Sequence, residues 1–381
     1  MISYLQALQM VIEISQKHSR AKQIEKTALI RSRGRVIAED VYSSQDVPAF
    51  NNSAMDGYAI LSTATQNVSK DKPVRLKVIG SIAAGETSDL SFIKNSTVQI
   101  MTGAKLPETL LFDAIIRQED AVRIGDEIEI SVSVKKGENL RWKGSDFKKG
   151  ELLLRKGTTL KAEHVSLLAT LGVDPVVVYK RPKIALISTG KELVPWESQS
   201  LLDSQIRNSS APYIMTFLER FGIEVDYLGI VPDSPEEYFK TLNPLIKNNQ
   251  YDMILSTGAV SVGKYDFVES VLKDLGAEII FHKTAIRPGK PILFASFKEQ
   301  GVHFFGLPGN VISSMVGVKF FLIPWIRSFL GLHAEVKRKA VLTEGFKKPE
   351  GLTCFFRASI QDLDAVVQIK INQDQASYKL K

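Results

Sequence analysis

The chain of 381 residues has a single cysteine, Cys354, and five histidines. One thiol excludes an intramolecular disulfide and a cysteine-built zinc or iron–sulfur site. Cys354 lies in an apolar, β-like run, LTCFF, so we expect a buried side chain rather than a catalytic nucleophile. The histidines show no ligand spacing, and a histidine-built metal site is therefore not expected.

Long apolar runs are also missing from the sequence. No uninterrupted apolar stretch reaches the roughly 18–20 residues that a bilayer span needs, and the N-terminus lacks the pattern of a secretory signal. Its apolar residues Leu5, Leu8, Val11 and Ile12 recur at helical spacing, which predicts an amphipathic helix. We expect a cytoplasmic protein without a membrane partner.

The charge balance is moderately basic, with a net charge of +7 from 49 basic and 42 acidic residues. Such an excess can serve nucleic acid, membrane surfaces or small anions. The basic residues are spread along the chain, with one denser stretch at 135–149, and no RNA-binding signature or basic helix accompanies them. Small anions are therefore the expected ligands, and a nucleic-acid partner is not.

Four regions differ in texture, within the range of two to four domains that this length predicts. Their ranges are a helical, elongated region from 1–45 and 139–181, an inserted β domain at 46–138, an α/β domain at 182–330 and a short C-terminal β domain at 331–381. In the third region, short apolar strands alternate with amphipathic helices, which predicts a three-layer domain with a parallel-type sheet. The predicted fold class is multidomain α/β plus β.

Small-residue turns follow the predicted strands of the α/β domain. Glycine lets the backbone approach a ligand, and free amides with hydroxyls at a helix start bind phosphate oxygens. One such turn is ordinary for a βα connection, but STG occurs twice and is joined by AVSVG and LPGN. The candidate anion-binding residues are Ser188, Thr189, Gly190, Ser256, Thr257, Gly258, Ser261, Gly263, Pro308, Gly309 and Asn310.

Three carboxylates, Glu192, Asp233 and Asp266, follow successive predicted strands. Each alone could be a helix cap or a solvated charge, and Asp233 before SPEE is a plausible N-cap. The carboxyl ends of parallel strands meet at one edge, so together the three predict a rim that holds Mg²⁺ against a phosphate or oxyanion.

A basic turn and an unusual loop complete the candidate sites. The segment HKTAIRPGKP (282–291) offers Lys283, Arg287 and Lys290 to an oxyanion, with a solvated loop as the alternative. In the N-terminal half, PAFNNSAMDGYAI (48–60) carries little net charge for a surface loop, and its Asp56 is by default an Asx-turn residue.

These motifs together resemble the molybdopterin molybdenumtransferase family, that is, MoeA-like proteins and the related C-terminal domain of gephyrin. The residues that carry the resemblance are PAFNNSAMDGYA, IMTGAKLP, STGKEL, STGAVSVGKYD, AIRPGKP and FGLPGN. They occur in the family's order over about 48–310. The resemblance implies that molybdate is inserted into adenylylated molybdopterin and AMP is released, with Mg²⁺. The pterin supplies the sulfur ligands, so no cysteine cluster is needed.

The resemblance also assigns roles to individual positions. Glu192, Asp233 and Asp266 match acidic cofactor and metal residues, and Lys283 and Arg287 match two lysines associated with molybdate, Arg287 being a departure. The matching residues of the other half of the cleft are Asp56, Thr102 and Asp146, with Arg357 aligned loosely in the C-terminal region. In the family that half comes from the second subunit, which implies a homodimer. The implied catalytic residues are Asp56, Thr102, Glu192, Asp266, Lys283 and Arg287.

Two alternatives remain open at this point. The C-terminal region is shorter than the family's and several loop residues differ, so the chain could be a cofactor carrier or a gephyrin-like scaffold. The adenylyltransferase of the preceding step shares the α/β domain, although the long N-terminal half argues against it. That adenylyltransferase and the molybdoenzymes are the implied protein partners.

Overall fold

The computed structural model describes residues 1–18, 20–258, 267–363, 366–372 and 375. The chain forms two compact units. The α/β unit comprises Met1–Glu39, Lys156–Ala169 and Val173–Lys381, and the β unit comprises Asp40–Arg155 and Thr170–Gly172. These two units are fewer than the four regions expected from the sequence, whose boundaries stay a prediction.

The β unit is built on a six-stranded sheet with the order β7-β4-β6-β5-β9-β8. Its strands are β4 (Gly57–Ile60), β5 (Val74–Ile82), β6 (Ser96–Ile100), β7 (Ala114–Arg117), β8 (Ala121–Ile124) and β9 (Glu127–Ile130). Only the β5–β6 pair is parallel among the pairings of this sheet. Alternate residues such as Ala59 and Ile60 enter two separate apolar clusters, so both faces of the sheet are covered.

The α/β unit holds a second six-stranded sheet, with the order β16-β13-β17-β21-β20-β18. Its strands are β13 (Ile184–Thr189), β16 (Val225–Val231), β17 (Met253–Thr257), β18 (Glu278–His282), β20 (Leu293–Phe297) and β21 (Val302–Leu307). The first four in this order are parallel, as predicted, whereas β20 and β18 are antiparallel additions at one edge. A four-residue turn joins β20 to β21, too short for the crossover that a parallel pair requires.

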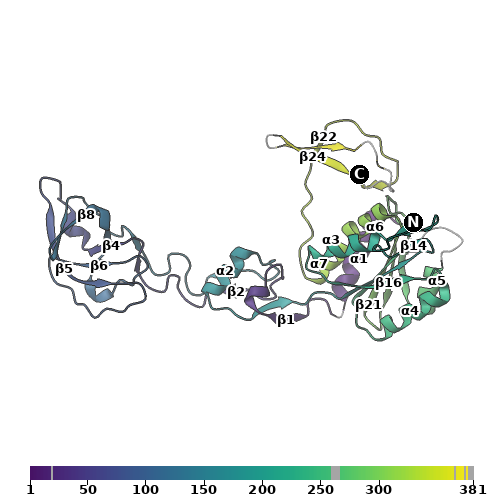
Figure 1. The fold of residues 1–381 in the computed structure, drawn as a ribbon, viewed down its shortest axis with the longest axis horizontal. Helices are drawn as coiled ribbons and strands as arrows, with labels where there is room; N and C mark the ends of the chain where they lie inside the picture. The colour runs from purple at the N-terminus through teal and green to yellow at the C-terminus, as the bar shows by residue number, and fades with distance from the viewer. Residues whose placement is uncertain (19, 259–266, 364–365, 373–374, 376–381) are drawn as a thin grey trace. The chain divides into compact units, whose positions relative to one another are not determined.

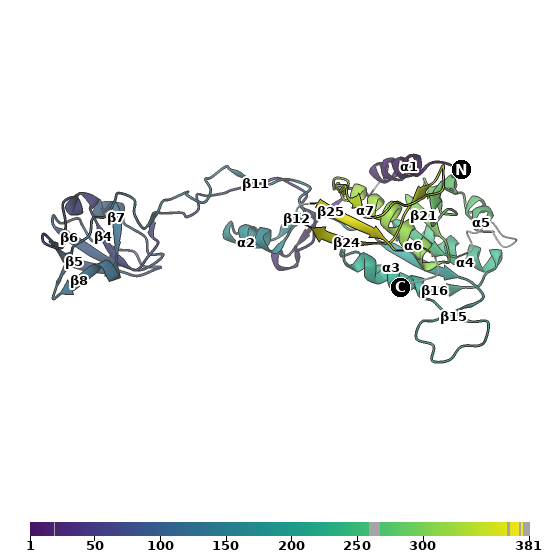
Figure 2. The ribbon, with the colours of Figure 1, turned by 90° about the horizontal axis from the view of Figure 1, so that it is seen from above.

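Helices cover both faces of this sheet (Figures 1 and 2). They are α1 (Tyr4–Lys17), α3 (Ser210–Glu219), α4 (Pro235–Lys247), α5 (Val268–Asp274), α6 (Val311–Gly317) and α7 (Ile323–Phe329), with α2 (Ala162–Thr170) preceding β12. Leu186 and Leu255 pack with α1, α3, α6 and α7, whereas Ala185 and Ile254 pack with α4 and α5. The alternation of strand residues thus assigns each face to its own helices.

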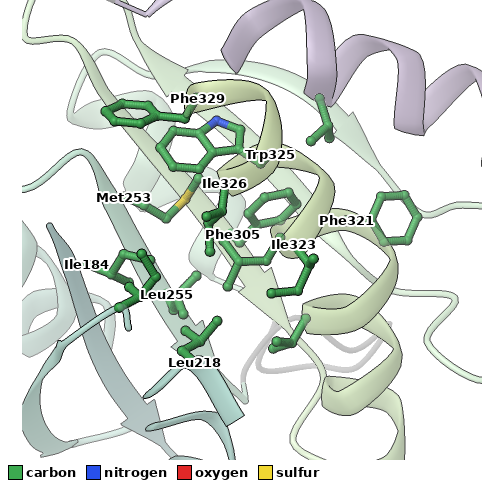
Figure 3. Packing of buried hydrophobic residues seen from close by; sticks show 14 of the residues in the cluster. Ile184, Leu218, Met253, Leu255, Phe305, Phe321, Ile323, Trp325, Ile326 and Phe329 are labelled. Carbon is green, nitrogen blue, oxygen red and sulfur yellow. The ribbon is translucent and has the colours of Figure 1, made fainter. Parts of the chain in front are cut away.

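Trp325 lies at the centre of the larger core, fully buried against Phe329 and near Met253 (Figure 3). Its Nε1–H donates to His303 Nδ1 at 3.0 Å, and its carbonyl accepts from Ser15 of α1 at 2.7 Å. The buried residues of α1 are Ala7, Val11 and Ser15, while Leu5 is 63% exposed. The helix was predicted correctly: of its four predicted apolar residues, Val11 is buried, Leu8 and Ile12 are half-buried, and only Leu5 is exposed.

The stretch Val311–Phe329 is helical, and by length and hydropathy it could cross a membrane. It comprises α6, the π-helical turn η5 (Val318–Leu322) and α7, and 67% of it is buried inside the protein. Pro324 has no N–H to donate to residue 320, which accounts for the wider turn at this point. The apolar composition of the stretch is explained by the core that it fills.

Short elements complete the fold. The paired strands are β1 (Ile24–Thr27) with β12 (Val176–Tyr179), β2 (Val41–Tyr42) with β11 (Leu152–Leu154), β3 (Asn52–Ser53) with β10 (Leu140–Arg141), β14 (Leu193–Val194) with β15 (Ile206–Arg207), and β19 (Ile286–Arg287) with β23 (Thr353–Cys354). The C-terminal sheet has the order β22 (Val341–Leu342), β25 (Val366–Ile371), β24 (Ala358–Leu363). The 3₁₀ helices are η1 (Leu29–Arg31), η2 (Ser62–Thr65), η3 (Glu108–Leu110) and η4 (Gln118–Asp120). Cys354 is partly exposed, so the expectation of a buried thiol was wrong: β23 lies at the edge of a two-stranded ladder.

Candidate active site

Three of the predicted anion-binding turns meet at the carboxyl edge of the parallel strands. Thr257 of β17 is in register with Ser188 of β13 and with Leu307 of β21. The N–H of Gly258 donates to the carbonyl of Leu307 at 3.0 Å, which links two of the turns directly. The expected convergence of strand ends is therefore present in the fold.

Glycine is required at position 258 by this close approach. A Cβ there would lie 2.2 Å from the carbonyl oxygen of Thr189, and the backbone has φ +94°. A Cβ on Gly309 would lie 3.7 Å from the Cα of Gly258. The backbones of the three turns are in contact, and a ligand at this edge meets main-chain atoms first.

Most hydroxyls of these turns are engaged within the protein, although Thr189 Oγ1 is buried without a hydrogen-bond partner among the described residues. Ser188 Oγ accepts hydrogen bonds from Asn208 Nδ2 at 2.9 Å and from Thr257 Oγ1 at 3.0 Å, and Ser256 Oγ accepts one from buried Tyr238 at 2.7 Å. Burial raises the pKa of Tyr238, so its hydroxyl stays a donor. These side chains set the shape of the turns and leave ligand contact mainly to the backbone.

Asn208 was not predicted from the sequence as part of the site. Its amide donates to Ser188 Oγ and to the Tyr227 hydroxyl, the latter at 2.8 Å, and its carbonyl accepts from Ala211 N–H at 3.2 Å. The available signal was the run NSS before α3, where an asparagine is first interpreted as a helix cap. The Asn208 side chain both accepts from an N–H at the start of α3 and donates to Ser188 at the end of β13, because it is buried between this strand end and the helix.

Asp233 and Glu192 bring carboxylates to the same edge. Asp233 follows β16, and its Oδ1 is buried without a hydrogen-bond partner among the described residues. Burial raises the pKa of Asp233; the charge of Lys191 lowers it and that of Glu192 raises it. Glu192 is exposed, and its carboxylate lies against Gly190, where a Cβ would be 2.9 Å from either oxygen. An unpartnered carboxylate oxygen beside a second acid is the donor set that a hard cation prefers.

The third predicted carboxylate, Asp266, lies outside the described residues, as do Ser261 and Gly263 of the same loop. Across the part of the chain that the structure describes, no group of three or more His, Cys, Asp or Glu side chains could hold a metal ion. The metal-binding trio therefore stays a prediction, of which two members are placed.

Asn310 and Pro308 have structural tasks at the start of α6. The Asn310 Oδ1 accepts from the N–H groups of Ile312 and Ser313 at 3.1 and 3.4 Å, which makes it the helix cap. The carbonyl of Pro308 accepts from the Ser314 hydroxyl. The LPGN turn is thus held rigidly, and its predicted contact with a cofactor is a separate, untested role.

The basic turn lines a cavity of about 730 Å³ together with the C-terminal region. Arg287 and Lys290 belong to its lining, and both are exposed. The lining residues beyond this turn are Ser313, Leu352, Phe355, Phe356 and Gln375. Lys283 is not among the residues that line this cavity; it has φ +73° and its N–H donates to Ile292 O at 3.0 Å. The structure thus separates the three basic residues that the sequence grouped.

Arg357 reaches this cavity only indirectly. Its backbone N–H donates to Gln375 Oε1 at 3.0 Å, and Gln375 Nε2 donates back to its carbonyl at 2.9 Å. Gln375 itself lines the cavity, and Phe355 N–H donates to Arg287 O at 2.8 Å. Of these C-terminal residues, only Arg357 was named from the resemblance, whereas Phe355 and Gln375 lie in no motif that the sequence analysis identified.

Within the β unit, the other predicted residues form a second constellation. Asp56 Oδ1 accepts from both the N–H and the hydroxyl of Thr102, each at 2.7 Å. These two hydrogen bonds, first the backbone one and then that of the hydroxyl, hold the pKa of Asp56 below its usual range. Asp56 is therefore a carboxylate at neutral pH, in a fixed orientation and open to solvent.

Asp146 belongs to the segment that runs beside the Asp56 loop. Its N–H donates to Val47 O at 2.9 Å, and its carboxylate pairs with Arg141 at 2.8 Å. The β3–β10 ladder joins Ser53 to Leu140, and Gly103 N–H donates to Ser53 O at 2.8 Å. Three motif-bearing segments thus meet in one unit, and Arg141 is a member that the motifs did not identify.

Two family models match the chain. The MoeA N-terminal region (domain I and II) matches residues 2–172, and a probable molybdopterin binding domain matches residues 185–328. Among curated relatives, the chain is 38% identical over 363 residues to a molybdopterin molybdenumtransferase of Synechococcus elongatus, which covers 94% of this chain and 87% of the relative. It is 33% identical over 347 residues to one of Staphylococcus epidermidis, which covers 91% and 81%.

The fold is likewise similar to a solved structure. A molybdopterin biosynthesis moeA protein from Pyrococcus horikoshii OT3 superposes with a TM-score of 0.78 at 28% identity, over 97% of this chain and 89% of the other. The agreement covers both units, each of which carries one of the constellations described above. The chain therefore belongs to the molybdopterin molybdenumtransferase family of molybdenum cofactor biosynthesis.

Proposed function

We propose that this protein inserts molybdate into adenylylated molybdopterin in the cytoplasm, with Mg²⁺ as the cation and AMP as the product. The observation that carries the proposal is the strand-end edge, where contacting backbone turns adjoin two carboxylates. One is Asp233, whose Oδ1 has no hydrogen-bond partner among the described residues, and the other is Glu192. Main-chain amides suit phosphate oxygens, and paired carboxylates suit the divalent cation that accompanies a phosphoanhydride.

The turn backbones at Gly190 and Gly309 would bind the phosphates of the substrate, while Gly258, whose N–H donates to Leu307 O, lets the turns approach each other. Asp233 and Glu192 would hold Mg²⁺, with Asp266 as the third carboxylate. When bound, the cation supplies positive charge that stabilises the phosphate leaving as AMP. The protein contributes rigid positioning, because the hydroxyl and amide network behind the turns leaves their backbones little freedom.

Molybdate would enter the cavity that Arg287 and Lys290 line. The fixed guanidinium fork of Arg287 and the point charge of Lys290 offer donors to an oxyanion in a cavity large enough for a small ligand. The dithiolene sulfurs of the pterin replace molybdate oxygens, so the only sulfur ligands needed come from the substrate.

Asp56 and Thr102 would act on this edge from a second copy of the chain, in a homodimer. Mixing two inactive variants tests this arrangement. Asp56→Asn and Glu192→Gln chains impair opposite halves of the site, so a mixed dimer would contain one intact site. Random exchange of equal amounts would restore about a quarter of wild-type activity. No recovery after demonstrated exchange of subunits would contradict a shared site.

Release of AMP tests the reaction itself. Purified protein, adenylylated molybdopterin, molybdate and Mg²⁺ are incubated, and AMP is separated and counted. We expect turnover by the wild type and a loss of at least about a hundredfold in Glu192→Gln, since a charged ligand at the site is removed. Glu197→Gln, an exposed glutamate on the far side of β14, is the matched control and should behave as wild type. Tight binding of molybdopterin without AMP release would make the protein a carrier instead.

A further inference from the structure

The opposite edge of the α/β sheet carries a basic cavity that the proposed reaction does not use. It has a volume of about 200 Å³ and lies at the amino ends of the parallel strands, where Lys183 precedes β13 and Asp252 precedes β17. A strand of six residues spans roughly 20 Å, so the cavity is remote from the strand-end turns. Its lining residues are Arg20, Gln23, Lys180, Arg181, Lys183, Asn249, Gln250, Asp252 and Phe329.

Four basic side chains line this small volume with one carboxylate, and that carboxylate is already satisfied. Asp252 is buried, accepts from the Lys183 N–H at 2.7 Å, and pairs with Arg20 at 3.3 Å. Arg20 also donates to the backbone and side chain of Asn249, beyond the end of α4. The charges of Arg20 and Asp252 therefore offset each other, which leaves Lys180, Arg181 and Lys183 as the remaining positive residues that line the cavity.

Those three charges come from one rigid segment, Lys180-Arg181-Pro182-Lys183, between β12 and β13. Pro182 restricts the backbone, and Lys180 N–H donates to Gln23 O at 2.7 Å. Among the described residues, none of the three has a carboxylate oxygen within the 4.0 Å of an ion pair. Within the described part of the chain, Arg181 donates a long hydrogen bond, 3.4 Å, to Gly34 O.

The Arg181 guanidinium is the most constrained of them. A Cβ on Gly222 would lie 2.1 Å from its Nη2, so the guanidinium packs against the Gly222 backbone. Burial lowers the pKa of Arg181 and the neighbouring charge of Arg35 lowers it further, whereas the charges of Glu224 and Glu25 raise it. Gathering like charges in a partly desolvated place costs free energy, which a bound anion recovers.

We propose that this cavity binds a phosphate group, held by Lys180, Arg181 and Lys183 with the amides of Gln23 and Gln250 at its rim. Its volume lies below the roughly 300–1,000 Å³ of sites that enclose drug-sized ligands. The size therefore favours free inorganic phosphate over the phosphate of a nucleotide. Occupancy of this cavity would follow the concentration of inorganic phosphate, at the edge of the sheet opposite to the one proposed for the reaction.

Isothermal titration with inorganic phosphate at constant ionic strength tests the proposal. We expect the Lys180→Gln/Arg181→Gln variant to bind at least about tenfold more weakly than wild type, since two charge-assisted contacts are lost. Lys70→Gln/Lys72→Gln removes the same charge from exposed positions of the β unit and should leave binding unchanged. Lys183→Gln, an exposed residue whose backbone contact to Asp252 survives, repeats the test if Arg181 proves necessary for folding.

Equal binding by wild type and the cavity variants would overturn the proposal, as would equal weakening in the Lys70/Lys72 control, which would mean non-specific attraction. A phosphate bound only at the strand-end turns, located by a crystal soak, would also overturn it. Titration with AMP distinguishes the source of the phosphate: binding weaker than that of inorganic phosphate supports the size argument. None of these measurements uses the pterin substrate, so they stand whether or not AMP is released in the proposed reaction.

Discussion

Replacing Gly258 by alanine separates the close approach of the strand-end turns from ordinary backbone strain. Gly258 has φ +94°, and its new Cβ would lie 2.2 Å from Thr189 O. Gly276, after α5, has φ +88° and nothing within 4 Å of a Cβ. The two positions share the conformational cost of a side chain at positive φ, about 1–2 kcal/mol, and differ only in the clash.

The clash at position 258 adds the cost of overpacking a rigid site, about 1–3 kcal/mol. Its neighbour is a backbone carbonyl within a buried ladder, which cannot rotate away as a flexible side chain could. Gly276→Ala should therefore lower the free energy of unfolding by about 1–2 kcal/mol, and Gly258→Ala by about 2–5 kcal/mol.

Thermal unfolding followed by near-ultraviolet circular dichroism measures both variants against wild type. At about 2–4 °C per kcal/mol, Gly258→Ala should melt roughly 2–12 °C below Gly276→Ala. Gly258→Ala should also lose phosphate-ester binding at the strand-end edge, which Gly276→Ala retains. Equal melting temperatures for the two variants would refute the claim that the turns are in backbone contact.

Three further predictions concern single groups. Burial lowers the pKa of His303 to about 3, so its imidazole stays neutral in the folded protein, whereas the unfolded chain takes up a proton below pH 6.5. The free energy of unfolding should therefore fall by about 2 kcal/mol between pH 8 and pH 5. Urea titrations at each pH measure this fall, which should be smaller in His303→Asn. Burial raises the pKa of Asp233, so its ionisation destabilises the fold above the pKa of the unfolded state. Asp233→Asn should therefore melt at a higher temperature than wild type at pH 7, yet lose Mg²⁺-dependent AMP release. An unchanged melting temperature would contradict this reasoning. Thr102→Val keeps the backbone N–H donor but removes the hydroxyl that lies 2.7 Å from Asp56, so AMP release should fall while the melting temperature changes little. The control is Thr109→Val, at an exposed threonine of the same unit, which should leave both AMP release and the melting temperature unchanged.

Periodicity and turn composition determined much of the α/β unit in advance. The alternation of buried strands with helices predicted β13, β16, β17 and β21 with their helices, because each element needs only local residues to set its period. The recurring STG turns predicted that the strand ends would meet, because parallel strands place their carboxyl ends at one edge. The motif order also indicated the family, which the relatives confirm.

Tertiary structure decided the features that depend on distant contacts. The antiparallel edge strands β20 and β18 and the exposure of Cys354 follow from what packs beside each element. Asp56 became a fixed carboxylate only through Thr102, 46 residues away, and the KRPK segment became a cavity wall only beside Arg20 and Asn249. A sequence specifies the period of each element locally, whereas the partners of a side chain are chosen when the whole core closes.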